Sequence, residues 1–323
     1  MANGTTSLND LQQVEVLHDV SGSGRVRPWK DLKLDSIDIA ASFKRNGDLL
    51  RAKRMQYCAT DLQFAHYADG TKKLMYAQFC KNRLCPMCAW RKSLLIYHQT
   101  LDLINAIVSE NKKIRFLFLT LTIKNCQIYE LSAYMDRLQD GLNKLLRRKK
   151  LSVIKGCFYA FEITINKLTG FAHPHIHVLL AANSNYFGKD YISHDKWVEL
   201  WRQCCKLDYY PIVDIRPFRG DIAKATAEAA KYTVKGSDYQ FADKELQDLT
   251  VDILDNALYG RRVIGYRGIF KDMRNKLKQV DVENADLTDL GIEKEKENLN
   301  YLFIEKYQFK IGIGFTDSNY YLV

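Results

Sequence analysis

The sequence CFYAFEITINKLTGFAHPHIHVLL, residues 157–180, predicts a β-hairpin at the centre of the fold. Its first half alternates apolar side chains with Glu162 and its polar neighbours, which is the period of a strand. Gly170, in the loop Lys167–Phe171, allows a hairpin turn. His175 and His177 flank one apolar residue on the second strand, so both imidazoles lie on one face. In a hairpin of this length, Glu162 falls opposite His175 or His177 on that same face.

Two imidazoles and one carboxylate form a mixed nitrogen and oxygen site with few protein ligands and no thiolate. Such a site suits Mn²⁺ or Mg²⁺ that must also take up substrate oxygens. His173 lies on the same strand face and competes with Glu162 as the third ligand. Glu162 is favoured, because three alternate positions on one extended strand spread over roughly 13 Å and converge poorly. A structural histidine pair beside a solvated carboxylate is the alternative.

Four cysteines predict a second metal site, of a structural kind. Cys80, Cys85 and Cys88 have the spacing C-x4-C-x2-C, and Cys58 lies one hairpin length upstream. Four thiolates can close a tetrahedral zinc site, with Cys-Pro-Met-Cys as a tight knuckle. Burial as small apolar residues is a poorer interpretation, because the residues between Cys80 and Cys85 are polar. Two histidines are the other candidates for the fourth ligand, His66 and His98.

The third constellation is DIAKATAEAAKYTVKG, residues 221–236, which predicts a helix that Gly236 can end in the left-handed conformation. Glu228, Tyr232 and Lys235 share one stripe of this helix, because they are four and three residues apart. Lys231 adds a second cation beside the tyrosine. An exposed, charge-laced helix with one half-buried tyrosine is the alternative.

The remaining segments carry weaker patterns. Residues 91–110 predict an amphipathic helix, residues 114–123 a strand, and residues 128–148 a second helix. That helix ends in a basic run, which is either a solvated helix end or a set of phosphate contacts: Arg147, Arg148, Lys149 and Lys150. The acidic stretch 281–297 is interpreted as a mobile tail segment or a surface for a partner.

The composition favours an intracellular protein with a polyanionic partner. The chain has 323 residues, a formal net charge of +10, and eight cysteines. Its positive charge favours nucleic acid, and no apolar run or basic-then-apolar N-terminus predicts a membrane span or a secretory signal. We therefore expect a cytoplasmic protein whose clustered cysteines bind metal rather than form disulfides. No G-x-x-x-x-G-K-[ST] phosphate loop occurs, so unwinding of a duplex would need a host helicase.

Taken together, four segments resemble the replication initiators of small rolling-circle plasmids of Gram-positive bacteria, a branch of the HUH endonuclease superfamily. The segments are RLCPMCAWR at 83–91, FLTLT at 118–122, HPHIHVLL at 173–180 and EAAKYTVK at 228–235. The resemblance implies an α+β fold, with a central antiparallel sheet flanked by helices and a small zinc-binding module inserted or preceding. It also implies metal ligation by His175 and His177, Tyr232 as nucleophile, and Glu228 in the place of a second tyrosine.

On this interpretation the chain divides into an N-terminal segment of unclear role (1–50), a zinc-binding module (51–92), a nuclease domain (93–260) and a C-terminal segment with the acidic stretch (261–323). The expected function is nicking and strand transfer at origin DNA through a 5′-phosphotyrosine. A host helicase, and a second copy of the chain in a homodimer, are the expected partners. A transposase or relaxase, or a non-enzymatic zinc-containing DNA-binding regulator, is the alternative. Residues expected to contact DNA are Arg83, Arg91 and the basic run 147–150.

Overall fold

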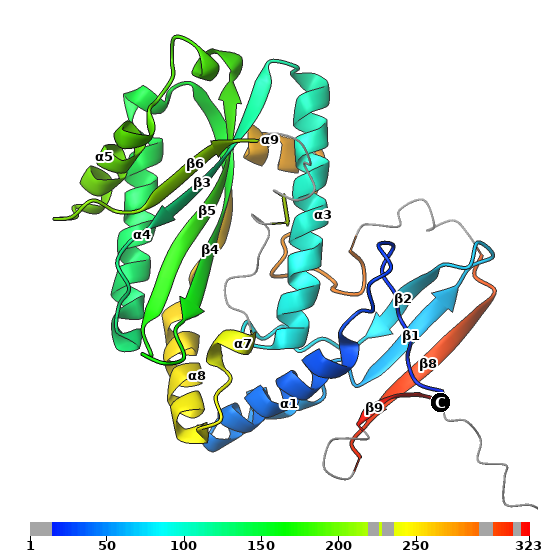
Figure 1. Cartoon of the computed structure of the whole chain (residues 1–323). Coiled ribbons are helices and arrows are strands. Elements are labelled where there is room, and N and C mark those ends of the chain that lie inside the picture. The colour runs from blue at the N-terminus through cyan, green and yellow to red at the C-terminus, as the bar shows by residue number, and fades with distance from the viewer. Residues whose placement is uncertain (1–14, 219–225, 228–235, 291–299, 313–317) are drawn as a thin grey trace, which may run out of the picture.

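The computed structural model describes residues 15–218, 226–227, 236–290, 300–312 and 318–323, which form two antiparallel sheets with helices around them (Figure 1). The strands are β1 (Asp61–His66), β2 (Lys72–Ala77), β3 (Ile114–Thr122), β4 (Ile154–Ile165), β5 (Ala172–Asn183), β6 (Val213–Pro217), β7 (Ile264–Gly268), β8 (Phe303–Lys310) and β9 (Asn319–Leu322). The α-helices are α1 (Trp29–Arg45), α2 (Leu49–Gln56), α3 (Pro86–Glu110), α4 (Leu131–Leu146), α5 (His194–Cys205), α7 (Gly236–Tyr239), α8 (Lys244–Leu258) and α9 (Ile269–Lys276). Short 3₁₀ turns are η1 (Ile128–Glu130), η2 (Lys149–Leu151) and η3 (Ser184–Phe187).

The larger sheet has five strands in the order β6-β3-β5-β4-β7. Its centre is the hairpin of β4 and β5, two strands of 12 residues each. Gly170 has a φ of +70° in the turn between them, a conformation that a residue without Cβ adopts at little cost. Both strands are buried along most of their length because neighbours cover them on both edges and both faces.

Helices cover the two faces of this sheet (Figure 1). On one face lie α4 and α5, and the indole of Trp201 donates a hydrogen bond to the Thr122 carbonyl. On the other face lie α3 and α9, where the rings of Phe116 and Phe270 are 6.0 Å apart. Trp197 and Trp201 are fully buried. They therefore belong to the core of the fold.

The smaller sheet has the order β2-β1-β8-β9 and packs against α1 and the start of α3. Trp29 on α1 is the centre of this packing, with its ring edge-on to those of Phe64 and Trp90. The C-terminal segment thus contributes to both sheets: β7 pairs with β4, while β8 pairs with β1. Residues 29–45, which carried no sequence motif, form a full helix within the same unit.

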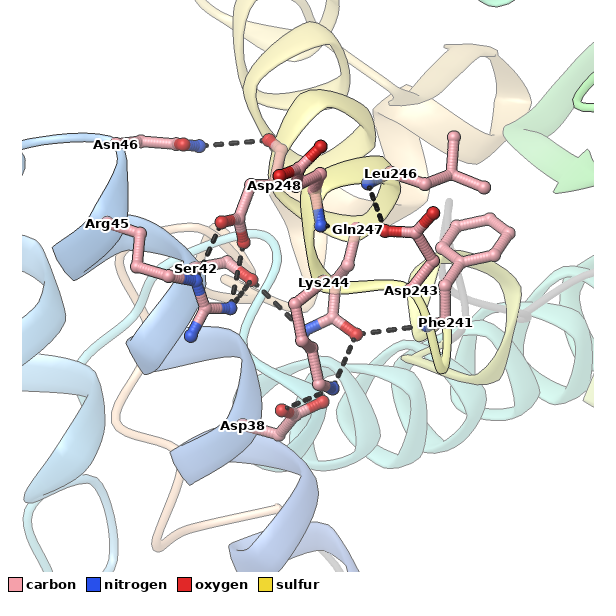
Figure 2. A network of polar contacts seen from close by, with 11 residues as sticks. Asp38, Ser42, Arg45, Asn46, Phe241, Asp243, Lys244, Leu246, Gln247 and Asp248 are labelled. Carbon is pink, nitrogen blue, oxygen red and sulfur yellow. Dashed lines mark hydrogen bonds and ion pairs between the residues drawn. The ribbon is translucent and has the colours of Figure 1, made fainter.

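A polar network joins α1 to the N-terminal half of α8 (Figure 2). The buried amide of Gln247 donates to Asp38 and Ser42 and accepts from the Phe241 N–H and from Lys244. Beside it, Arg45 donates to both carboxylate oxygens of Asp248, at 2.6 and 2.9 Å. A buried amide with all its hydrogen bonds made specifies one relative placement of the two helices.

The structure confirms the α+β fold with its central antiparallel sheet, and the helix expected at 91–110 lies within α3. Three expectations are corrected. The helix predicted at 128–148 is split into η1 and α4 and ends at Leu146, so the basic run follows the helix. Gly236 is the first residue of α7 and does not have a positive φ. In its described part, the acidic stretch is packed against α3, where Glu283 pairs with Lys92 at 2.6 Å.

Candidate nuclease site and zinc knuckle

Glu162, His175 and His177 come together on one face of the larger sheet. Glu162 is paired directly with His175 in the β4–β5 register, and His177 is paired with Ala160. The Oε2 atom of Glu162 lies 2.8 Å from Nε2 of His177 and 3.2 Å from Nε2 of His175, and the two Nε2 atoms are 3.2 Å apart. All three side chains are at least 90% buried. The pleat of a two-residue period therefore produces the convergence that the sequence predicted.

These distances suit a divalent ion. Adjacent ligands of an octahedral ion at about 2.1 Å are about 3 Å apart, close to each of the three observed separations. Two imidazoles and one carboxylate on one triangular face leave the other coordination positions to oxygens from substrate or water. The geometry and the donor set therefore both fit a divalent metal ion.

Hydrogen bonds behind the two histidines orient their rings. Nδ1 of His175 lies 3.2 Å from the carbonyl oxygen of His173, and Nδ1 of His177 lies 3.3 Å from the Thr120 hydroxyl on β3. A partner on Nδ1 directs Nε2 toward the ion, as in most histidine metal sites. His173 itself points elsewhere, with Nδ1 2.7 Å from the side-chain oxygen of Asn125. Burial, and then the nearby His175, lower the pKa of His173.

An arginine missing from the sequence prediction lies on the same sheet face. The ring of Phe118 is 5.5 Å from that of His177, and the guanidinium of Arg216 lies 5.2 Å from the Phe118 ring centre. Arg216 is on β6, where it forms an exposed ion pair with Asp214 at 3.3 Å. The alternation of Val213–Pro217 is the sequence signal that indicates this strand, and it is too short to identify the face.

The four cysteines form a compact, buried cluster. Cys58 follows α2, Cys80 follows β2, Cys85 is the N-cap of α3, and Cys88 lies in the first turn of that helix. The Sγ atoms of Cys58 and Cys88 are 3.5 Å apart, and two further pairs are 3.7 Å apart. Tetrahedral zinc with bonds of about 2.3 Å would separate its sulfurs by about 3.8 Å. The cluster therefore fits a structural zinc ion, with Cys58 as the fourth ligand.

Polar groups and the other thiols surround Cys85 in a way that favours its thiolate, whereas hydrogen bonds with the other cysteines and burial raise the pKa values of Cys58 and Cys88. The Cys80 N–H points at Cys58 Sγ from 3.4 Å, and the Ser36 hydroxyl lies 3.4 Å from Cys85 Sγ. Burial acts to raise the pKa of Cys85, but hydrogen bonds from the other thiols outweigh it and lower that pKa well below the ordinary value. His66 and His98 lie apart from the cluster: His66 pairs with Glu305 and stacks on Phe303.

The predicted catalytic helix falls outside the described residues. The range 228–235, which the described residues do not include, contains Glu228, Lys231, Tyr232 and Lys235. Of the predicted helix, Thr226 and Ala227 are described, and both are helical.

The basic residues predicted to contact DNA differ in their surroundings. Arg83 is partly exposed, two residues before the knuckle. The basic run 147–150 is exposed and lies before the start of β4. The start of that strand is about 25 Å from Glu162, so the run lies far from the candidate metal site. Arg91 contradicts the prediction. It is 1% exposed, and its guanidinium donates to the carbonyls of Leu287 and Thr288. It therefore ties the segment 281–290 to α3 and presents no surface to DNA.

Comparison with known proteins agrees with this arrangement. A family model described as replication protein matches residues 71–313, a range that includes both candidate metal sites except Cys58. The chain belongs to this family of replication proteins. It is 39% identical to a protein rep of Streptococcus pneumoniae serotype 2 over 285 residues, covering 85% of this chain and 87% of the relative. It is 37% identical to a protein rep of Bacillus amyloliquefaciens, covering 87% and 91%.

Membership confirms the resemblance to the Rep proteins of rolling-circle plasmids and identifies a plasmid replication initiator. A third relative, a protein rep from a Bacillus species, is 40% identical over 74% of this chain and 85% of its own length. No solved structure matches the fold significantly. Among the described residues, none of the helices has the length and apolar character needed to span a bilayer.

Proposed function

We propose that this replication initiator nicks one strand of its plasmid origin and retains the 5′ end as a phosphotyrosine. The observation that supports this most strongly is the convergence of Glu162, His175 and His177 on one sheet face, with Nε2 and Oε2 atoms within 3.2 Å of one another. Such a site serves a phosphodiester well, because the scissile phosphate is an anion that repels nucleophiles until its charge is neutralised.

Glu162, His175 and His177 would hold a Mn²⁺ or Mg²⁺ ion. When bound there, the ion supplies neutralisation and orientation of the scissile phosphate. The His173 carbonyl and the Thr120 hydroxyl then keep the two imidazoles in their coordinating orientation. This division of roles assigns no ligand function to His173.

Tyr232 is the proposed nucleophile. Its phenol oxygen bonds to the phosphorus while the bond from phosphorus to the 3′ oxygen breaks, and the phenol proton ends on the released 3′-hydroxyl. Tyrosine has an ordinary pKa near 10, so the cations Lys231 and Lys235 would favour loss of that proton at neutral pH. The energy of the phosphodiester is kept in the protein–DNA bond, and the 3′-hydroxyl can prime synthesis.

Glu228 is proposed to end the cycle by activating a water that hydrolyses the last strand. One helical turn separates it from Tyr232 in the predicted helix, which would let both act on the same phosphate. In this scheme Glu228→Ala should leave the first nick intact and impair release. Loss of initial nicking as complete as in Tyr232→Phe would refute the division of labour.

The other proposed roles concern assembly on DNA. Zn²⁺ on the four cysteines would fix the knuckle that Arg83 precedes, and the basic run 147–150 would contact phosphates of flanking duplex. The target phosphate enters as single-stranded or extruded DNA. A host helicase supplies unwinding, and a homodimer is the proposed form that engages two sides of an origin.

The test is incubation of the purified protein with supercoiled DNA of its own replicon, with and without added Mn²⁺, followed by denaturing electrophoresis. Peptide mapping then identifies any residue linked to DNA. We expect an adduct on Tyr232 that requires added metal and is absent in Tyr232→Phe. Tyr191, 60% exposed after the far end of β5, provides the matched control variant Tyr191→Phe. Bound but closed and unlinked DNA would instead support a zinc-containing DNA-binding regulator.

A further inference from the structure

Two adjoining cavities form a groove beside the candidate nuclease site. One, of about 280 Å³, is lined by the turn and strand at 260–266, by α9, and by residues 281–284. The other, of about 300 Å³, lies over the end of α8. Both are lined by Arg83, before the knuckle, and by Gly260. The pair is called the arginine groove, because Arg83, Arg261, Arg262 and Arg274 line the first of the two cavities.

The groove begins at the edge of the metal-binding face. Ala160 on β4 is paired with Ile264 on β7, and the Phe161 N–H donates to the Val263 carbonyl at 2.9 Å. Continuing this register by two residues brings Arg262 level with Glu162. Because the side-chain period of a strand is two residues, Arg262 belongs to the face of Glu162. A strand of DNA with its phosphate at the metal site would therefore have Arg262 within reach on this side.

The cations of the groove are only partly neutralised. The Arg262 side chain is 75% exposed and lies 4.0 Å from Asp281, at the limit of an ion pair. Arg83 lies 3.6 Å from Glu283, which is also held at 2.6 Å by Lys92. The Nε atom of Arg274 is buried and has no hydrogen-bond partner among the residues that the structure describes. Of the other charged groups, Arg261 is paired with Asp136, and Asp255 is paired with Arg51. The cationic capacity that remains for phosphates therefore lies mainly on Arg262.

Tyr259 supplies a platform for a base. Tyr259 is 85% exposed, which leaves a large apolar ring in contact with water. It caps α8, and Gly260 after it has a φ of +66°, which turns the chain between the two cavities. An exposed aromatic ring beside guanidinium groups is the combination that binds unpaired bases and their backbone. Bases in a duplex are already stacked, so this combination favours a single strand.

We infer that the arginine groove binds the single-stranded DNA adjoining the scissile phosphate, with Arg262 on a phosphate and Tyr259 stacked on a base. The inference rests on the proposed nicking function for the position of the strand next to the scissile phosphate. The binding itself requires no cleavage of DNA.

The experiment measures binding of fluorescein-labelled oligo(dT) of 12 nucleotides by anisotropy at several salt concentrations, without added divalent ions and without a chelator. We expect Tyr259→Ala and Arg262→Ala each to weaken binding about tenfold. Arg262→Ala should also reduce the slope of log affinity against log salt by about 0.7, because one phosphate contact is lost. Tyr259→Ala should leave that slope unchanged, and Tyr259→Phe and Arg262→Lys should restore most of the affinity.

Matched controls come from the far end of the larger sheet, where Tyr191→Ala removes an exposed ring and Lys189→Ala an exposed cation. Unchanged binding in the controls, with melting temperatures equal across the set, would support the groove. Normal oligo(dT) binding by both groove variants would overturn it, and so would an equal loss on a dT·dA duplex. The proposed nicking function is tested separately by the Tyr232 adduct, so either can fail alone.

Discussion

The substitution Arg91→Met tests whether Arg91 stabilises the fold, as the structure indicates, or contacts DNA, as the sequence suggested. The guanidinium is 1% exposed, donates to the Leu287 and Thr288 carbonyls at 2.8 and 3.1 Å, and lies 5.6 and 5.5 Å from the rings of Trp29 and Trp90. Methionine keeps a similar length in an apolar site and removes the charge. The substitution therefore tests the ties between α3 and the segment 281–290.

The magnitude follows from opposing contributions. Two hydrogen bonds from a charged donor are worth about 3–6 kcal/mol together, and the desolvated contacts with indole rings add about 2 kcal/mol. Against them, burial lowers the pKa of Arg91 to about 10, a cost to the charged form of about 3 kcal/mol. We expect a net loss of about 3 kcal/mol in the free energy of unfolding. For 323 residues unfolding together, this lowers the melting temperature by about 4 °C.

The assay combines thermal unfolding, limited proteolysis and the salt dependence of duplex binding. Arg91→Met should melt earlier and be cleaved faster within residues 281–290, while the slope of log affinity against log salt stays at the wild-type value. Arg148→Met, in the exposed basic run, is the matched control and should leave the melting temperature unchanged. A wild-type melting temperature together with a smaller salt slope for Arg91→Met would refute the structural role and restore the DNA contact.

Three further predictions concern the metal sites and acid stability. Glu162→Gln should reduce metal-dependent nicking by about 100-fold or more, whereas His173→Ala should change it little, as single-turnover nicking assays would measure. Cys85→Ser should abolish binding of zinc by the purified chain and lower its melting temperature, as metal analysis and calorimetry would show. Hydrogen bonds from Arg45 lower the pKa of Asp248, so this pair stabilises the fold above the ordinary aspartate range and loses its effect as the pH falls through the lowered pKa. For this partly exposed pair, Asp248→Asn should cost roughly 0.5–1 kcal/mol near pH 7 and progressively less toward pH 3 in urea titrations.

Each of these predictions has an outcome that contradicts it. Equal loss of nicking in Glu162→Gln and His173→Ala would make His173 the third ligand or deny the site a metal. Retention of zinc by Cys85→Ser would show that the four cysteines do not bind it. Cys126→Ser, at a buried cysteine outside the cluster, is the control. A destabilisation by Asp248→Asn that does not change between pH 7 and pH 3 would show that the pair acts through packing rather than charge.

The parts of the site that could be predicted from the sequence are those fixed by short-range geometry. A strand period of two and a short loop limit the partner of Glu162 to His175 or His177, and the observed register pairs it with His175. The cysteine spacing likewise determines a turn that brings Cys85 and Cys88 together at the start of α3. In both cases the relevant residues lie on one hairpin or one turn, so no knowledge of distant packing was needed.

Residues placed by long-range packing could not be predicted in the same way. Arg91 has the composition of a DNA contact, yet its surroundings come from segments almost 200 residues away in the sequence. The acidic stretch has the composition of a tail, but Glu283 forms ion pairs with Lys92 on α3 and with Arg83 before that helix. Charge patterns indicate that a side chain needs a partner, and they do not say whether that partner is solvent, DNA or another part of the chain.

Strand β7 links the metal site to the arginine groove, and two glycines make this link possible. A Cβ on Gly268, whose φ is +53°, would lie 2.2 Å from the Lys155 carbonyl oxygen, and one on Gly156 would lie 2.3 Å from the Arg267 carbonyl oxygen. Only without these atoms can β7 lie close against β4 and bring Arg262 level with Glu162. The opposite wall of the groove is Arg83, three residues after Cys80 and two before Cys85. Disrupting the cysteine cluster should therefore weaken single-strand binding through the position of Arg83, although no cysteine lines the groove.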